Sequence, residues 1–396
     1  MACGATGVIG SDLFERMVSL RRDLHQHPEL SWQERRTAGQ ICEFLDGLGI
    51  AYRRDVAGTG IIAEIPSKSA GPYVALRADM DALPIVEETG LPFASQNQGA
   101  MHACGHDGHT SMLLGAASLL AAEHELPAPV RLIFQPAEET GDGARAMIDA
   151  GALNDVAMIF GGHVDRHFVV GSMAGTDGAG NASSDRFSLM VTGKGGHAAR
   201  PHETIDAVVV GSLMVMALQT IVSREVNPAH PSVVTVGRFD AGTASNVIAG
   251  QAHLQGSIRS QDQDVRESLH RSIERMAQSI GQLHGAAVEV TIDLGTPSVH
   301  NPPEYTDIAR RAATIAVGRE NIVQMEIANM GGEDFGYYLE QVPGCYVRFG
   351  TARAGVEQYP AHSSKFDFDE EALAVGAAYY RAVAEVAGQG IRERCG

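Results

Sequence analysis

Short apolar runs alternate with amphipathic stretches along the first half of the chain. The strand-length apolar runs lie at residues 60–65, 73–79, 130–139 (interrupted by Pro136) and 156–164. Apolar side chains at helical spacing occupy residues 12–48, which end at Gly49, and residues 109–124. Buried strands separated by helices predict a largely parallel sheet with helices on both faces.

The pattern changes near Asn181 and returns to the first type from about Thr306. Between them the order is strand, helix, strand, strand, helix, strand, at residues 186–193, 204–225, 232–240, 251–260, 265–285 and 287–294. This is the order of a ferredoxin-like unit. The sequence therefore predicts an α/β fold in which a large domain, residues 1–183 and 299–396, carries an inserted small domain at 184–298.

Composition narrows the class of protein. A chain of 396 residues exceeds the usual size of a single core, which agrees with two domains. The net charge of −18 argues against nucleic acid or an anionic membrane as a partner. The N-terminus has no basic region before an apolar core, and no apolar run approaches ~18 residues. Five scattered cysteines do not suggest a disulfide framework, so we expect a cytoplasmic protein.

Residue types that bind metals follow several predicted strands. They are Asp79 and Asp81, the segment "HACGHDGH" at 102–109, Glu138 and Glu139, His163, and His362 in a later loop. Ligands in open parallel sheets bind outside the carboxyl ends of the strands, so these five groups are expected to converge on one cleft.

Most of these groups also have a purely structural explanation. Two aspartates can form a turn, paired glutamates can precede a helix, and an isolated histidine can lie in the core or in a surface loop. Segment 102–109 is different, because three histidines, a cysteine and an aspartate fall within eight positions. No second cysteine or histidine pair lies nearby to complete a structural zinc site, so this segment indicates a metal or catalytic role.

The paired glutamates suggest a mechanism. One carboxylate can bind a metal while its neighbour acts as a general base on water and then protonates a leaving amine. The thiolate of Cys104 could bridge two divalent ions. Such a set of residues suits amide hydrolysis.

Nine motifs along almost the whole chain carry a family resemblance. They are "LRRDLHQHPELSWQE" (20–34), "LRADMDALP" (76–84), "MHACGHDGHT" (101–110), "FQPAEE" (134–139), "GKGGHAARPHETIDAV" (193–208), "NVIAG" (246–250), "GSIRS" (256–260), "MGGEDF" (330–335) and "AHSSKFDFDE" (361–370). The chain resembles the dinuclear-metal aminoacylase and carboxypeptidase family. Within it, the chain is most similar to hippurate hydrolases, N-acyl-amino-acid amidohydrolases and plant auxin-conjugate hydrolases.

The resemblance implies a role for each matching residue of the large domain. The implied metal ligands, with Cys104 as the bridge, are Cys104, His106, Glu139, His163 and His362. Glu138 would be the general base and acid, and Asp81 would orient a ligand histidine. The implied cofactor is two divalent ions per chain, which could be Mn²⁺, Zn²⁺, Co²⁺ or Ni²⁺.

The resemblance also implies that the small domain serves as a lid and a dimerisation surface. His197 would reach the active site of the other subunit in a homodimer and stabilise the oxyanion. Asn246 and Arg259 would bind the carboxylate or carbonyl of the substrate. Structural alternatives are a helix cap for His197, a turn for Asn246 and a surface ion pair for Arg259.

The implied function is metal-dependent hydrolysis of N-acyl amino acids, or of related small amides and dipeptides, by a metal-bridged hydroxide. One alternative is hydrolysis of another C–N bond, in a carbamoyl group or an aryl amine. Another is a non-catalytic dimer that binds metal or ligand, although such a protein has no need of a general base such as Glu138 beside the metals. The segment "FGGHVDRHFVVG" (160–171) departs from the family at Gly162 and at Asp165–His167, which predicts a more polar pocket wall.

Overall fold

The protein divides into two compact units. The computed structural model describes residues 9–69, 71–325 and 329–395. The first unit contains the described residues up to Gly178, from 300 to 325, and from 334 onward. The second contains residues 179–299 and 329–333. The insertion expected at 184–298 lies within this second unit, which also includes the short later segment 329–333.

A mixed eight-stranded sheet forms the centre of the first unit. Its strands, in spatial order, are β1 (Ala51–Val56), β2 (Gly60–Ile65), β4 (Val130–Gln135), β3 (Tyr73–Asp79), β5 (Val156–Val169), β16 (Gly344–Ala352), β6 (Met173–Ala174) and β15 (Ile322–Val323). The four central strands, β4, β3, β5 and β16, run parallel to one another. Every residue of β4 is buried, as expected for a strand covered on both faces. The predicted mostly parallel α/β fold is confirmed.

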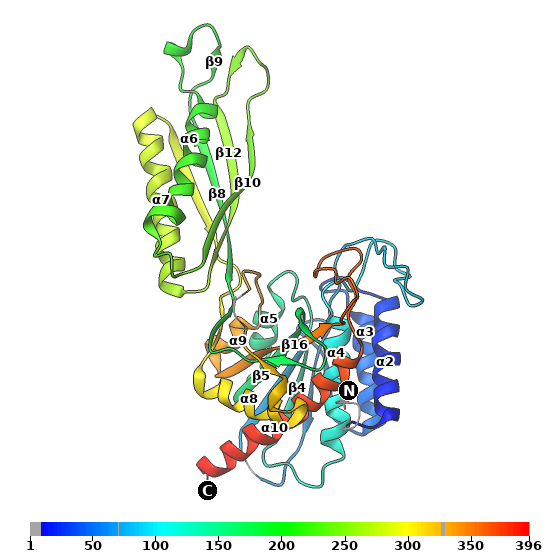
Figure 1. The fold of residues 1–396 in the computed structure, drawn as a ribbon. Helices are drawn as coiled ribbons and strands as arrows, with labels where there is room; N and C mark the ends of the chain where they lie inside the picture. The colour runs from blue at the N-terminus through cyan, green and yellow to red at the C-terminus, as the bar shows by residue number, and fades with distance from the viewer. Residues whose placement is uncertain (1–8, 70, 326–328, 396) are drawn as a thin grey trace. The chain divides into compact units, whose positions relative to one another are not determined.

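Helices pack against this sheet and against one another (Figure 1). They are α2 (Ser11–Gln26), α3 (Arg35–Leu48), α4 (His106–Ala121), α5 (Gly143–Asp149), α8 (Pro303–Val317), α9 (Gly336–Gln341) and α10 (Glu371–Cys395). The axes of α4 and α10 approach closely, because a Cβ at Gly376 would lie only 2.2 Å from the sulfur of Met112. Close packing of α4 matters for function, since this helix begins at His106.

Three details differ from the expected elements. The helical stretch at 12–48 is two helices, because Pro28 fixes its own backbone and disfavours helix at His27. Strand β1 was not predicted, since five of its six side chains reach the surface and leave no apolar run. Strand β5 continues to Val169, well past the apolar run that ends at Val164.

The second unit has the predicted ferredoxin-like order. Strands β8 (Ser183–Thr192), β10 (Ser232–Ala241), β12 (Gln251–Ser260) and β13 (Ala287–Asp293) form an antiparallel sheet in the order β10-β12-β8-β13. Helices α6 (Ala207–Thr220) and α7 (Gln263–His284) lie side by side on it (Figure 1). Two short strands, β9 (Gly196–His197) and β11 (Val247–Ile248), pair with each other. The remaining short strands are β7 (Gly178–Asn181) and β14 (Val299–Asn301).

One helix is long and apolar enough to cross a membrane by length and composition alone. It spans Ala207–Glu225, combining α6 with a π-helical end, and one third (33%) of its most apolar window is buried. Scattered polar residues within it explain why no uninterrupted apolar run was found. Cys42, Cys104 and Cys345 form no disulfide, and Cys3 lies outside the described residues. A cytoplasmic location stays a prediction.

A buried ion pair joins β8 to α7 in the second unit. The carboxylate of Asp185 accepts hydrogen bonds from Arg266 Nε at 2.7 Å and Nη2 at 2.6 Å, and lies 2.8 Å from His270 Nε2. Burial alone would raise the pKa of Asp185, but the hydrogen bonds from Arg266 and His270 outweigh it and lower the pKa to about 2.

We expect Asp185→Asn to destabilise the second unit by about 3 kcal/mol, because Arg266 would lose its buried anionic partner. Because the folded pKa lies below the unfolded one, this contribution is present above about pH 4 and is lost as the pH falls toward 2. Chemical denaturation at several pH values measures it. Asp240→Asn, in an exposed pair with Arg238, is the control and should cost under about 1 kcal/mol. Equal losses would contradict the prediction.

Candidate metal centre

The ends of parallel strands bring the candidate ligands together in the first unit. Cys104 and His106 lie on either side of Gly105, at the start of α4. Gly105 has a φ of 97°, and a Cβ there would lie 2.5 Å from Val164, so only glycine fits this turn. Glu138 and Glu139 follow β4, as expected. His163 lies inside β5 and not at its end, because β5 continues to pair with β16 beyond it.

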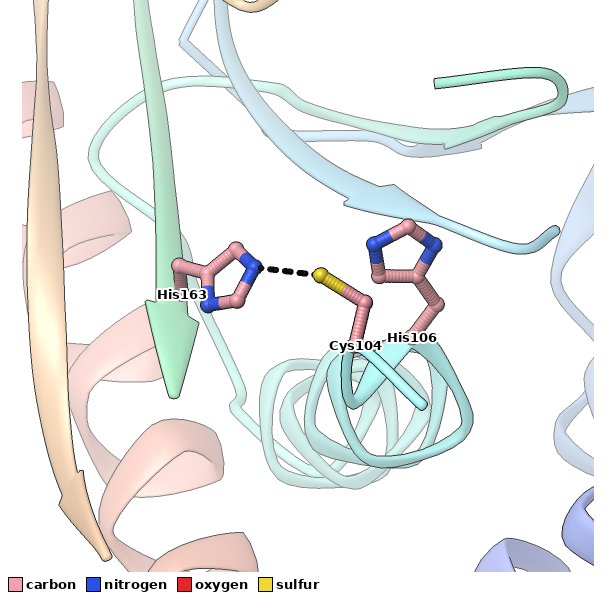
Figure 2. Close-up of side chains that lie close together, drawn as sticks. All are labelled: Cys104, His106 and His163. Carbon is pink, nitrogen blue, oxygen red and sulfur yellow. Dashed lines mark hydrogen bonds between the residues drawn. The ribbon is translucent and has the colours of Figure 1, made fainter. Parts of the chain in front are cut away.

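Cys104, His106 and His163 form one group of possible ligands. Figure 2 shows the sulfur of Cys104 between the two imidazole rings. The Cys104 Sγ to His163 Nε2 distance is 3.2 Å, and one ligand atom from each of the three residues lies within 4.8 Å of the others.

Cys104, Glu139 and His362 form a second group that meets the same 4.8 Å criterion. His362 Nε2 lies 3.4 Å from Glu139 Oε2. The loop of His362 is held on the cysteine loop, because the His362 N–H donates to the Ala103 carbonyl at 2.8 Å. His362 has a left-handed φ of 67°, which is uncommon outside glycine. Cys104 belongs to both groups, the arrangement expected of a bridging thiolate.

The chemistry of these side chains fits divalent cations. His106 Nε2 and Glu139 Oε1 are buried and have no hydrogen-bond partner among the described residues, which is costly unless a ligand meets them. Burial, followed by the charge of Glu139, raises the pKa of the Cys104 thiol, so a cation is needed to hold it as a thiolate. Burial and the neighbouring His109 lower the pKa of His163, which keeps it as the neutral imidazole that binds metals.

Asp81 links the two sides of the centre. His106 Nδ1 lies 2.9 Å from the Asp81 carbonyl oxygen and 3.3 Å from Asp81 Oδ1. The Asp81 carboxylate also accepts the backbone N–H groups of Glu138 at 3.0 Å and Glu139 at 3.1 Å. His106 Nε2 lies 4.0 Å from the Glu138 carboxylate and 3.9 Å from that of Glu139, and the role of Asp81 in orienting His106 stays a prediction.

Two other polar residues of segment 102–109, Asp107 and His109, have structural partners. Asp107 accepts a hydrogen bond from Arg21 Nε at 2.9 Å and lies 2.9 Å from His25 Nδ1. His109 Nδ1 lies 2.7 Å from Asp79, and its Nε2 accepts the Val164 N–H at 3.0 Å. Both ring nitrogens of His109 therefore have hydrogen-bond partners within the protein.

Sequence reasoning missed several residues around the centre. His102 received no role, and both of its ring nitrogens are buried without a hydrogen-bond partner among the described residues. Arg21, His25 and Glu34 were quoted only as parts of a motif, although all three are fully buried beside the metal-centre loops. Their burial depends on tertiary packing, so no local pattern in the sequence marked them.

Gly162 does not form the wall of a pocket, contrary to expectation. A Cβ at this position would lie 2.6 Å from the ring of Phe349 and 2.8 Å from Val347, and both of these residues belong to the buried core. The bulk of Phe349 therefore takes the place of the side chain missing at 162. Asp165 accepts the backbone N–H of His167 at 2.9 Å, and its carboxylate lies 2.7 Å from the His167 ring.

Three predicted site residues belong to the second unit. His197 in β9 pairs with Val247, and the Ala198 N–H donates to the Asn246 carbonyl at 3.1 Å, so His197 and Asn246 are neighbours. Both are exposed. Arg259 lies at the far end of β12 and is half-buried.

Comparison with known proteins decides the family. The sequence profile of peptidase family M20/M25/M40 matches residues 75–386. The chain belongs to this M20 family. An N-acetylcysteine deacetylase of Bacillus subtilis is 41% identical over 374 residues, which cover 94% of this chain and 96% of that protein. The Arabidopsis thaliana IAA-amino acid hydrolase ILR1-like 4 is 37% identical over 382 residues, covering 94% and 86%.

A solved M20 structure gives the same result. The YXEP protein of Bacillus subtilis, described as a dinuclear metal-binding peptidase, matches with a TM-score of 0.84 and 38% identity, covering 96% of this chain and 99% of that one. The predicted family is confirmed, and this M20 chain is a metal-dependent hydrolase of C–N bonds. Two divalent metals are supported, while the identity of the metals stays a prediction.

We expect Cys104→Ser to lose both metal ions, because Cys104 belongs to both ligand groups, whereas His163→Ala and His362→Ala should each lose one. Metal content per chain, measured by mass spectrometry after reconstitution with Mn²⁺, Zn²⁺, Co²⁺ or Ni²⁺ and desalting, tests this. His167→Ala is the matched control and should keep both ions. Two ions retained by Cys104→Ser would exclude the bridge.

Proposed function

We propose that this M20 chain hydrolyses the amide bond of N-acyl amino acids, with Cys104, His106, Glu139, His163 and His362 holding two divalent ions. The observation that carries the proposal is that both ligand groups share Cys104 while Glu138 remains next to them. Glu138 forms a further group with His106 and Glu139 in which ligand atoms lie within 4.8 Å.

Glu138 is suited to move a proton at this centre. Its carboxylate lies 4.0 Å from His106 Nε2, and the Asp334 N–H points to Glu138 Oε1 at 3.4 Å. Its side chain is 11% exposed, so it can reach both a water molecule and a substrate. Bound divalent ions supply polarisation of the carbonyl and a lower pKa for water. Glu138 removes the proton from the attacking water and delivers it to the departing amine.

Arg259 is suited to bind the carboxylate of the amino-acid part. Its guanidinium makes no hydrogen bond or ion pair with the described residues, and Nη1 lies 3.3 Å from the point that a Cβ on Gly332 would occupy. The missing side chain at Gly332 leaves room beside the guanidinium, whose planar fork matches a carboxylate. The deacetylase and hydrolase relatives, which are named for amino-acid substrates, support the same class.

A carbamoyl or another polar acyl group is the second candidate. Asp165 and His167 place polar atoms on β5 two and four residues beyond His163. Side chains alternate along a strand, so His163 and Asp165 share one face. The pairing of β5 with β16 is irregular between Asp165 and Val169, but the His167 ring lies 2.7 Å from the Asp165 carboxylate. The sequence departure at 165–167 therefore bears on the acyl pocket, whereas that at Gly162 does not.

We further propose a homodimer formed through the second unit. Four apolar side chains of α6 are between 40% and 70% exposed: Val208, Val209, Leu213 and Met216. Strand β10 ends the four-stranded sheet, and its outer edge has no partner among the described strands. An exposed apolar helix face beside an open sheet edge is typical of an interface between copies. His197 of one chain would then stabilise the oxyanion in the site of the other.

Release of amino acid from N-acetyl, N-benzoyl, N-carbamoyl and indolyl-acyl amino acids tests the proposed reaction. We expect metal-dependent release from one acyl class, and much weaker release when the substrate carboxylate is converted to an amide. Glu138→Gln should keep both metals yet lose about 10³-fold or more in kcat, because it cannot accept the proton. Comparable turnover by Glu138→Gln would reject the role of Glu138 as the base. Equal release from substrates with and without the carboxylate would reject the role of Arg259.

Mixing two inactive variants tests the shared site. Chains carrying Glu138→Gln and chains carrying His197→Ala should each be nearly inactive alone. In a hybrid dimer, one of the two sites combines an intact Glu138 with an intact His197 from the other chain, so co-expression should restore activity. Sedimentation of the wild type gives the oligomeric state. A monomeric active enzyme, or no recovery in verified hybrids, would contradict the arrangement.

A further inference from the structure

The N-terminal motif at 20–34 has no role in the proposed reaction, yet it contacts several loops of the metal centre. Arg21 and His25 hold Asp107, the neighbour of His106. The Ser31 hydroxyl donates to Asp81 Oδ2 at 2.7 Å. Leu30 forms an isolated bridge with Ala82. The last residue of the motif, Glu34, is completely buried, which requires an explanation because an ionised side chain is rarely buried without partners.

Glu34 and Asp81 together hold the loop that presents Glu138. Three consecutive backbone N–H groups of this loop point at two buried carboxylates. The Ala137 N–H donates to Glu34 Oε1 at 3.0 Å. The N–H groups of Glu138 and Glu139 donate to the two oxygens of Asp81. Hydrogen bonds from backbone N–H groups to a carboxylate are among the stronger ones, so this loop has a defined conformation.

One oxygen of Glu34 accepts hydrogen bonds from two residues that have unfavourable backbone conformations. Ala137 and Trp32 have left-handed φ values of 55° and 68°. Both donate their N–H to Glu34 Oε1, at 3.0 Å and 2.9 Å. The Thr59 hydroxyl fixes the other oxygen at 2.6 Å. Left-handed residues other than glycine persist only where the surroundings enforce them, and here one carboxylate does so for both segments.

Helix capping does not account for the buried Glu34 side chain. Glu34 stands at the N-cap of α3, but its side chain makes no capping hydrogen bond. The carboxylate of Glu29 instead accepts two N–H groups of the first turn of that helix, from Arg36 at 3.0 Å and Thr37 at 2.8 Å. The Glu34 carboxylate is therefore directed at Ala137 and away from the helix.

We propose that Glu34 is a positioning residue that sets the backbone of Ala137 and thereby aims the Glu138 carboxylate. The role rests on the proposed function, in which Glu138 moves the proton. Glu34 itself touches neither substrate nor metal ligand. An acceptor oxygen is all that the two N–H groups require, so glutamine can replace glutamate at this position, with its amide donating to the Thr59 hydroxyl.

The test compares Glu34→Ala, Glu34→Gln and the control Glu29→Ala. Hydrogen exchange of the peptide that covers Ala137–Thr140 is measured by mass spectrometry, as purified and after chelation. Exchange in Glu34→Ala should be about tenfold faster than in the wild type, with or without metal. Its kcat should fall by about 100-fold with KM within about threefold, since misplacing a reacting group mainly affects turnover. Glu34→Gln should restore both quantities.

The Glu29→Ala control distinguishes an effect on the position of Glu138 from a general loss of fold stability. Glu29→Ala removes the cap of α3 and should lower the melting temperature while leaving exchange at 137–140 and kcat near wild type. If Glu34→Ala fails to fold, Thr59→Val, which frees one oxygen of Glu34, should show the same changes to a smaller degree.

Unchanged exchange in Glu34→Ala, or a Glu34→Gln variant as impaired as Glu34→Ala, would overturn the proposal. A wild type inactive on every substrate would instead reject the proposed function, while the exchange data would still decide the role of Glu34.

Discussion

The metal centre depends on the hydrogen bonds that the Asp81 carboxylate accepts from the loop that carries Glu138 and Glu139. Asp81 receives two successive N–H groups from the loop after β4, and its own carbonyl faces the ring of His106. The residue therefore joins two segments that arrive from different strands. Because it contacts both segments, it keeps the nitrogen of His106 close to the oxygens of the glutamates.

Further buried ion pairs surround these hydrogen bonds of Asp81. Arg21 pairs with Asp107, and Arg77 bonds both Asp79 and Asp334. Each of these groups is almost completely buried, so each would destabilise the fold if its partner were removed. The cost of burial is offset because every charge has a geometrically defined partner. The same ion pairs fix the segments that carry the candidate ligands, which is what a preorganised site requires.

The two units contribute different residues to the proposed reaction. The first unit contains all five candidate metal ligands and Glu138, on a sheet whose central strands are buried on both faces. The second contains His197, Asn246 and Arg259 on a separate antiparallel sheet with its own core. In the proposed arrangement, the preference for the amino-acid part can change in the second unit while the metal ligands of the first unit stay the same.

The sequence by itself determined the fold class, the βαββαβ order of the second unit and the set of candidate ligands. The fold class and the strand order follow from hydrophobic period and strand length, which neighbouring residues carry. The roles of the ligands follow from the family resemblance of the motifs that contain them. The tertiary structure alone decided that Gly162 faces Phe349 and that Glu34 reaches Ala137. Each of these depends on segments far apart in the chain. Register and burial set such contacts, and no local pattern records them.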